Sequence, residues 1–148
     1  MVSGDKFKFA QLNLHRSNNP SLLFDRFCMM EKIDFALFQE PHCYNGTVTS
    51  LKSGSIVIDK RFVSPRAGIM VRKGHCFMVL NQFCSRDMIT ISVGCESHGS
   101  SENVLICSAY LPGDDVLPNE FIALMEYCLI HNEHLIVGCD ANAHHTIW

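Results

Sequence analysis

The chain has 148 residues, of which 47% are apolar and 18% are charged, and its formal net charge is −3. This composition is typical of one folded globular domain with a buried core, and it excludes a disordered or fibrous chain. The slightly acidic balance also excludes a basic field over the whole molecule of the kind that attracts nucleic acid.

The predicted elements alternate between strand and helix patterns. In chain order they are a strand at 7–14, a helix at 19–32, a strand at 35–38, a loop at 45–54, strands at 56–58, 67–71, 77–80, 88–93 and 104–111, a helix from 118, and a strand at 134–139. Only short polar segments separate the strands at 67–71, 77–80 and 88–93, so we expect these to be successive antiparallel partners. The order predicts an α/β architecture in which helices cover substantially buried sheets.

Both predicted helices carry apolar residues at helical spacing. The first has Asn19 as its N-cap and Pro20 at its first helical position. The residues expected to face the core are Leu23, Phe24, Phe27, Cys28, Met30, Phe121, Leu124, Met125, Cys128 and Leu129.

The cysteines and the hydropathy of the sequence indicate in which cellular compartment the protein is expected. No apolar run approaches the ~18 residues of a membrane span, and the N-terminus lacks the apolar stretch of a secretory signal peptide. None of the eight cysteines forms a Cys-x-x-Cys pair, and most lie in apolar segments, where a free thiol behaves as a small hydrophobe. We therefore expect an intracellular protein with reduced cysteines and no membrane partner.

Five polar side chains lie within predicted strands or at their carboxyl ends: Asn13, Glu40, Tyr110, Asp140 and Asn142. Such ends meet at one edge of an open α/β sheet, and a polar side chain in an apolar strand is costly unless it is paired. Considered one at a time, three of these residues also have a structural interpretation. Asn13 could bond a neighbouring backbone group, Glu40 could be a surface charge at a strand end, and Tyr110 could be a core aromatic with a hydrogen-bonded hydroxyl. Asp140 and Asn142 are two residues apart and share a face if the chain is extended there. Together the five indicate a site.

A basic segment without a single acid covers residues 60–73, and two interpretations of it stay open. It is either the solvated edge of a hairpin or a surface that contacts nucleic-acid phosphates. In the second interpretation the contacts come from Arg66, Arg72 and Lys73.

Four segments, in this order, resemble the endonuclease/exonuclease/phosphatase superfamily. They are Gln11-Leu12-Asn13, Phe38-Gln39-Glu40-Pro41, Ser108-Ala109-Tyr110-Leu111-Pro112 and Gly138-Cys139-Asp140-Ala141-Asn142-Ala143-His144. The Asp-Ala-Asn-Ala-His-His motif is more specifically similar to the apurinic-endonuclease-like domain of non-LTR retrotransposons. The resemblance implies a partial four-layer α/β sandwich over residues 1–148, with two mixed or antiparallel sheets flanked by helices.

The resemblance also implies a nicking endonuclease that hydrolyses DNA phosphodiester bonds with Mg²⁺ or Mn²⁺. Glu40 matches the principal metal ligand and Asn13 an asparagine near the metal. Tyr110 matches a tyrosine that contacts the scissile phosphate. Asp140 matches the aspartate that orients or deprotonates the attacking water, and Asn142 the asparagine that holds that aspartate and the phosphate in register. Such an enzyme acts in the nucleus, and its full-length polyprotein carries a reverse transcriptase domain.

His144 and His145 do not match the catalytic histidine of the superfamily, which belongs to a Ser-Asp-His motif far downstream. We interpret them as loop residues, with a place in the DNA groove as the alternative. A zinc site built from His131, His134, Cys139 and His144 lacks any recognised spacing.

Members of the superfamily take their last strands, a second metal-side aspartate and an aspartate–histidine pair from residues beyond these motifs. We therefore expect a domain truncated before its final strands, with an unpaired apolar sheet edge and no substantial nuclease activity of its own.

Two other functions stay open. The chain could be a non-catalytic remnant that binds nucleic acid or a partner through residues 60–73. It could also be a phosphatase of the same superfamily that acts on a small molecule or a lipid headgroup. The Asp-Ala-Asn-Ala-His-His motif disfavours this phosphatase alternative. Target-site preference depends on groove-reading loops, which carry no signal here.

Overall fold

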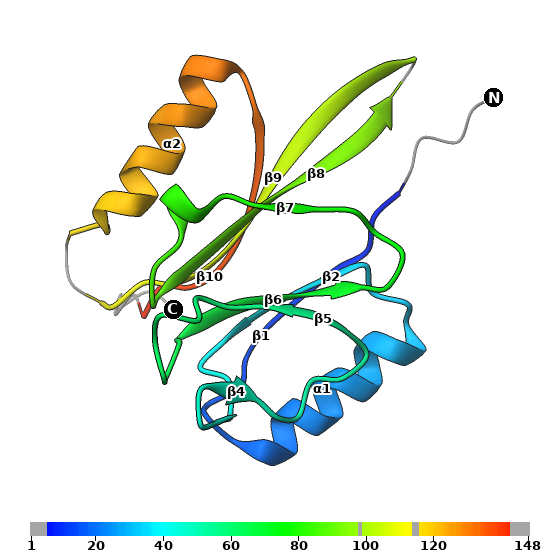
Figure 1. Cartoon of the computed structure of the whole chain (residues 1–148), viewed down its shortest axis with the longest axis vertical. Coiled ribbons are helices and arrows are strands. Elements are labelled where there is room, and N and C mark those ends of the chain that lie inside the picture. Colours follow the sequence, from blue (N-terminus) through cyan, green and yellow to red (C-terminus); the bar gives the residue numbers. More distant parts are fainter. Residues whose placement is uncertain (1–5, 98, 114–115, 143–148) are drawn as a thin grey trace, which may run out of the picture.

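The computed structural model describes residues 6–97, 99–113 and 116–142 as two β-sheets packed face to face, with a helix outside each (Figure 1). The first sheet has the order β1 (Phe9–Asn13), β2 (Phe35–Gln39), β6 (Ala67–Arg72) and β5 (Gly54–Val57), and the second β10 (His134–Asp140), β9 (Ser100–Tyr110), β8 (Met88–Ser97) and β7 (Met78–Val79). The helices are α1 (Asn18–Met30) and α2 (Asn119–His131). The predicted α/β sandwich is confirmed.

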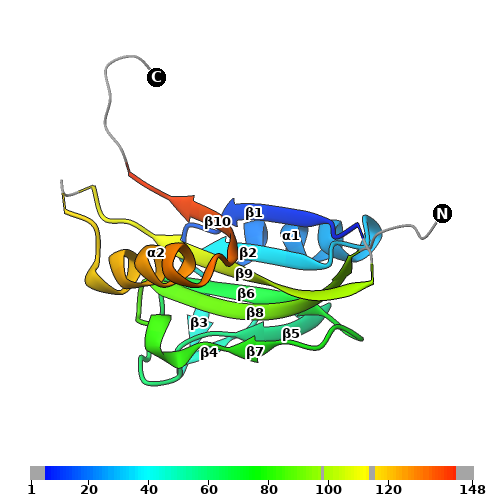
Figure 2. The ribbon, with the colours of Figure 1, turned by 90° about the horizontal axis from the view of Figure 1, so that it is seen from above.

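The strand directions bring four strand ends together. β1 runs parallel to β2, and β10 runs parallel to β9, whereas the other neighbours within both sheets are antiparallel. In the described part of the chain β1 and β10 each pair on one side only, and they lie beside one another on the same flank (Figure 2). This flank exposes apolar side chains of both strands, as expected for an unpaired sheet edge.

Alternation along the central strands produces three apolar layers. In β2, Phe35 and Leu37 pack between the two sheets, whereas Ala36 and Phe38 pack against α1. In β9, Ile106 joins the layer between the sheets, and its neighbours on either side face α2. Both faces of these strands are buried, which explains why their sequences are near-continuous apolar runs.

The pairing predicted for the strands at 67–71, 77–80 and 88–93 is half right: β7 and β8 are antiparallel partners, but β6 does not pair with β7. β6 lies inside the first sheet between β2 and β5, whereas β7 and β8 belong to the second sheet. Since β6 already has a partner on each side, the chain must cross to the other sheet before β7.

The predicted loop at 45–54 begins with the turn and second strand of a small hairpin, formed by β3 (Cys43–Tyr44) just before it and β4 (Thr47–Val48) within it. Asn45 and Gly46 form its turn, with φ angles of 47° and 74°. Asn-Gly is a strong signal for such a two-residue turn, and the flanking strands are only two residues long.

The buried helix faces are narrower than the sequence pattern predicts. α1 begins at Asn18 with Ser17 as its N-cap, so Pro20 lies within the first turn, where its missing N–H costs nothing. The buried helical residues are Ser21, Phe24, Cys28, Leu124 and Cys128. The predicted core residues that the structure leaves exposed are Leu23, Phe27, Met30, Met125 and Leu129. Each helix contacts one sheet only, which buries an i, i+4 row rather than a broad stripe.

Two further features of the fold are the buried cysteines and the length of the helices. Cys28, Cys84, Cys107 and Cys128 are buried thiols, and burial raises the pKa of Cys107 to about 12 and that of Cys28 to about 11. These four therefore act as small core hydrophobes. In the described part of the chain, neither 13-residue α-helix has the length and hydropathy to cross a membrane.

Asp34 anchors the amino end of β2. Its side chain is only 5% exposed and accepts hydrogen bonds from the backbone N–H of Lys8 (2.8 Å) and from Arg72 Nε (3.0 Å), with His75 Nε2 at 2.7 Å. Burial alone raises the pKa of Asp34, but these donors outweigh it, so the pKa lies below its ordinary value. Arg72 is thereby committed to this end of the first sheet.

We expect Asp34→Asn to lower the free energy of unfolding by about 2 kcal/mol at pH 7, because it removes the charge that Arg72 and its neighbours bind. Since the pKa of Asp34 is lower in the folded than in the unfolded chain, its stabilisation is complete above the unfolded value of about 3.9 and is lost as pH falls through the folded value. Urea unfolding of both proteins should show a difference that shrinks below about pH 4. Glu126→Gln, an exposed glutamate on α2, is the control. A difference independent of pH would contradict this account.

Candidate functional site

The carboxyl ends of four strands meet at one edge of the sandwich. Asn13 ends β1 and Glu40 follows β2 in the first sheet, while Tyr110 ends β9 and Asp140 ends β10 in the second. Asn13 lies in register with Gln39, and Asp140 with Tyr110. Because both pairs of strands are parallel, their carboxyl ends point the same way, and the sandwich joins them into one site.

Gln39 holds the two sheets together directly beneath this site. It is fully buried, and its Nε2 donates to Ser108 Oγ (3.1 Å) and to the carbonyl of Gly138 (3.2 Å). Its Oε1 accepts from Gln11 Nε2 at 2.6 Å. Gly138 allows this approach, because a Cβ there would lie 2.8 Å from a methyl of Leu37. The network fixes β2 against β9 and β10.

One amide joins the carboxylates of the two sheets. Asn13 Nδ2 donates to Glu40 Oε2 at 3.1 Å and also to Asp140 Oδ2. Its Oδ1 faces away and accepts from the backbone N–H of His15 at 2.7 Å. In this geometry Asn13 holds Glu40 and Asp140 in place, and these two carboxylates are the acidic groups gathered at the site.

Glu40 has a backbone conformation that L-residues rarely adopt. Its φ is 46°, and the turn is held by its N–H, which donates to the carbonyl of Arg66 (2.9 Å), and by its carbonyl, which accepts from the N–H of Arg16 (2.7 Å). Arg16 Nε lies 3.6 Å from Glu40 Oε1, with side-chain exposures of 55% and 21%. Positive φ at a non-glycine residue stores strain, and such residues cluster at functional sites.

Asn142 and Asp140 form a turn of their own. Asn142 has a φ of 42°, its N–H donates to Asp140 Oδ1 (3.2 Å), and its Nδ2 donates to the carbonyl of Leu111 (3.5 Å). Both oxygens of Asp140 therefore have donors, Asn13 on one side and Asn142 on the other. The guanidinium of Arg66 lies over the ring of Tyr110 next to them.

The structure brings six predicted residues to one place and leaves others elsewhere. Those together at the site are Asn13, Glu40, Arg66, Tyr110, Asp140 and Asn142. Arg72 lies at the opposite end of β6 with Asp34, and Lys73 follows it directly. His144 and His145 lie outside the described residues.

The basic segment at 60–73 is largely neutralised. Arg61 pairs with Asp59, Arg66 with Asp87, and Arg72 with Asp34. The zinc site considered from the sequence includes His144 and so lies partly outside the described residues. Within residues 6–97, 99–113 and 116–142, no group of three or more His, Cys, Asp or Glu side chains is arranged to hold a metal ion, so a cation at the candidate functional site takes fewer protein side chains of these types.

Sequence reasoning missed Arg16 and Asp87. Arg16 follows the end of β1, so the same rule that selected the polar residues after strands would have found it. Asp87 looks like part of a polar turn, and only the packing of the sheets shows that it faces Arg66.

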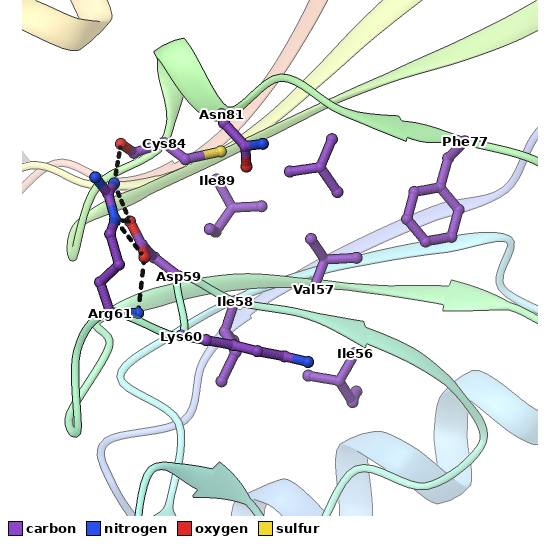
Figure 3. A pocket seen from close by; sticks show the side chains of 11 residues that line it. Ile56, Val57, Ile58, Asp59, Lys60, Arg61, Phe77, Asn81, Cys84 and Ile89 are labelled. Atoms are coloured by element: carbon purple, nitrogen blue, oxygen red, sulfur yellow. Dashed lines mark hydrogen bonds and ion pairs between the residues drawn. The ribbon is translucent and has the colours of Figure 1, made fainter.

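A separate cavity lies away from this site. A hollow of about 630 Å³ opens between β5 and β7 (Figure 3), the sheet edges opposite β1 and β10. Apolar side chains dominate its lining, and the carboxylate of Asp59 is occupied by Arg61. It lacks convergent ligands for a metal or a phosphate.

The chain has the fold of the endonuclease/exonuclease/phosphatase proteins. The endonuclease domain of TRAS1, a telomere-specific non-LTR retrotransposon, superposes with a TM-score of 0.66 at 20% identity over 97% of this chain. Two further neighbours are TDP2 of D. rerio in complex with a single-strand DNA product (TM-score 0.53, 14% identity, 94% of this chain) and an endonuclease/exonuclease/phosphatase family protein from Leptotrichia buccalis (TM-score 0.53, 11% identity, 91% of this chain).

This chain spans less than two thirds of the first structures it matches: 62% of the TRAS1 domain, 62% of the TDP2 chain and 66% of the bacterial protein. No protein-family model matches the sequence, and no curated protein matches it. The likeness therefore establishes the fold, and the chemistry rests on the site.

We expect Asn13→Ala to lower the free energy of unfolding by about 2 kcal/mol at pH 7, because it removes the donor shared by two carboxylates. Acid pH should reduce the loss, since protonated carboxyls no longer repel one another. Chemical denaturation at pH 7 and pH 4 measures both effects, with the exposed Asn81→Ala as the control. An unchanged stability at pH 7 would show that the bridge does not form in solution.

Proposed function

We propose that this chain carries the metal-binding and water-activating residues of an endonuclease that hydrolyses DNA phosphodiester bonds with Mg²⁺ or Mn²⁺. The main observation in support of this proposal is the Asn13 amide, which joins Glu40 of one sheet to Asp140 of the other. DNA as the substrate is supported by two neighbours of this fold, a retrotransposon endonuclease domain and a TDP2 that holds a DNA product. In this proposal the protein works in the nucleus beside a reverse transcriptase domain.

The donor set fits a hard divalent cation. Glu40 offers carboxylate oxygens, and Mg²⁺ typically takes one or two carboxylates and completes its shell with waters and substrate phosphate. When bound, the ion supplies Lewis-acid stabilisation of the charge that develops on the phosphoryl oxygens. Arg16, which lies against Glu40 and is largely exposed, adds a positive charge at the mouth of the site.

The other residues act on the water and the phosphate. Asp140, held by Asn13 and Asn142, orients the attacking water and accepts its proton as the water oxygen bonds to phosphorus. The bond from phosphorus to the 3′ oxygen then breaks, and that oxygen takes up a proton. The hydroxyl of Tyr110 and the amide of Asn142 are the groups of this chain that contact the phosphate.

The described part of the chain contains two histidine–carboxylate pairs, His75–Asp34 and His134–Glu102, and neither lies at the site to protonate the leaving oxygen. Both lie at the strand ends opposite Glu40 and Asp140. The described residues therefore supply one half of the acid–base chemistry.

The alternatives fit the structure less well. A remnant that binds nucleic acid through residues 60–73 loses support, because three of the arginines in that segment are paired with aspartates. A small-molecule phosphatase shares the fold and stays an outcome of the assays below.

Glu40→Gln should weaken Mn²⁺ binding by about tenfold or more, because it removes a carboxylate charge from the proposed metal site. Titration of the 148-residue chain with Mn²⁺, followed by electron paramagnetic resonance of the free ion, measures the affinity. Glu126→Gln, an exposed glutamate on α2, is the matched control. Equal affinities for wild type and Glu40→Gln would remove Glu40 from the metal site.

The chain by itself should nick supercoiled plasmid about 10² to 10⁴ times more slowly than the TRAS1 domain in Mg²⁺, because one acid–base partner is absent from its described site. Single-turnover assays with protein in excess give both rate constants, and Asp140→Asn serves as the blank. Nicking that persists in Asp140→Asn would refute the role given to Asp140. Turnover of inositol phosphates without plasmid nicking would favour the phosphatase.

A further inference from the structure

Arg66 and Asp87 form an ion pair between the two sheets. Arg66 precedes β6 in the first sheet, and Asp87 precedes β8 in the second. Arg66 Nε lies 2.5 Å from Asp87 Oδ1, and Nη2 pairs with Oδ2, so the contact is bidentate. The two side chains are 23% and 22% exposed, and Asp87 raises the pKa of Arg66 above its ordinary value. Two-point contact fixes the plane of the guanidinium.

The fixed guanidinium covers one face of Tyr110. Arg66 Cζ lies 4.6 Å from the centre of the ring. A flat cation stacked on an aromatic ring is favourable, and a lysine ammonium reproduces neither the fork nor the stack. The Tyr110 ring is therefore held by a group whose own orientation Asp87 sets.

The backbones of the same two residues hold the ends of the site. The N–H of Glu40 donates to the carbonyl of Arg66 at 2.9 Å, and the N–H of Tyr110 donates to the carbonyl of Asp87 at 2.8 Å. The Arg66–Asp87 pair thus lies between the metal side of the site, which belongs to one sheet, and the phosphate side, which belongs to the other.

Arg61 and Asp59 provide an internal comparison. They also form a multidentate pair, but the two residues are close in sequence and line the cavity between β5 and β7 (Figure 3). Pairing with a carboxylate is therefore common to both arginines, whereas contact with Tyr110 and Glu40 distinguishes Arg66.

We propose that Arg66 is a positioning residue, which sets the place of the Tyr110 side chain relative to Glu40 and Asp140. This inference rests on the proposed function in one respect: the contact of Tyr110 with the substrate phosphate. Arg66 itself is not expected to bind the phosphate, since Asp87 occupies its donors on one edge and its face lies on the ring.

Fluorine NMR of the 148-residue chain labelled with 3-fluorotyrosine tests this directly. The chain has three tyrosines, at positions 44, 110 and 127, and Tyr110→Phe assigns the signal of interest. Spectra are compared for wild type, Arg66→Lys, Asp87→Asn and the control Arg61→Lys, with and without Mn²⁺, whose paramagnetic broadening falls steeply with its distance from each ring.

In Arg66→Lys and Asp87→Asn we expect the Tyr110 signal to move toward the position of free fluorotyrosine and its Mn²⁺ broadening to change at least twofold. The signals of Tyr44 and Tyr127 should stay in place, and Arg61→Lys should match wild type. Asp87→Asn matters because its side chain reaches Tyr110 only through Arg66.

Unchanged Tyr110 shift and broadening in both variants would overturn the proposal. So would a common change of all three tyrosines with a lower melting temperature, which would make the pair a general stabiliser of the fold. If Mn²⁺ broadens no tyrosine in wild type, the proposed metal site fails, and the shifts measured without Mn²⁺ still decide the role of Arg66.

Discussion

The site of this protein depends on hydrogen bonds between two sheets. Glu40 and Asp140 belong to different sheets, and like-charged carboxylates repel one another unless a donor lies between them. The Asn13 amide is that donor, and the buried Gln39 network beneath it fixes the distance over which it acts. Buried polar networks of this kind are favourable only when every member is paired. Within the described residues no buried side-chain nitrogen or oxygen lacks a partner.

Local backbone geometry then aims the side chains. Glu40 and Asn142 follow the ends of parallel strands, and each turns with a positive φ. Asparagine tolerates this conformation, whereas at glutamate it costs free energy that the surrounding hydrogen bonds must offset. The turn at Glu40 is held from the first sheet by Arg66 and from the end of β1 by Arg16. The strain and its compensation therefore lie within the same small group of residues.

The sequence predicts what depends on local pattern, and it fails where tertiary packing decides. Period and turn chemistry locate most strands and both α-helices, and the rule that polar residues after parallel strands converge predicts that Asn13, Glu40 and Asp140 lie together, as they do in the structure. The assignment of β6 to one sheet and β7 to the other leaves no trace in the sequence, since both segments are short apolar runs. Arg72 is basic and near Arg66 in sequence, yet the length of one strand separates it from the site. Asp87 shows how a residue in an ordinary turn acquires a role from a contact across the sandwich.

The charge distribution constrains how such a site meets a polyanion. The chain has a net charge of −3, and Arg61, Arg66 and Arg72 are each engaged with an aspartate. Two carboxylates at the site add further repulsion toward a phosphate, and Arg16 offsets only part of it. A divalent cation at Glu40 reverses the local sign and also draws charge from the phosphoryl oxygens. In the proposed function, attraction of nucleic acid and catalysis therefore depend on the same ion, and the described residues alone disfavour binding to a phosphate backbone without it.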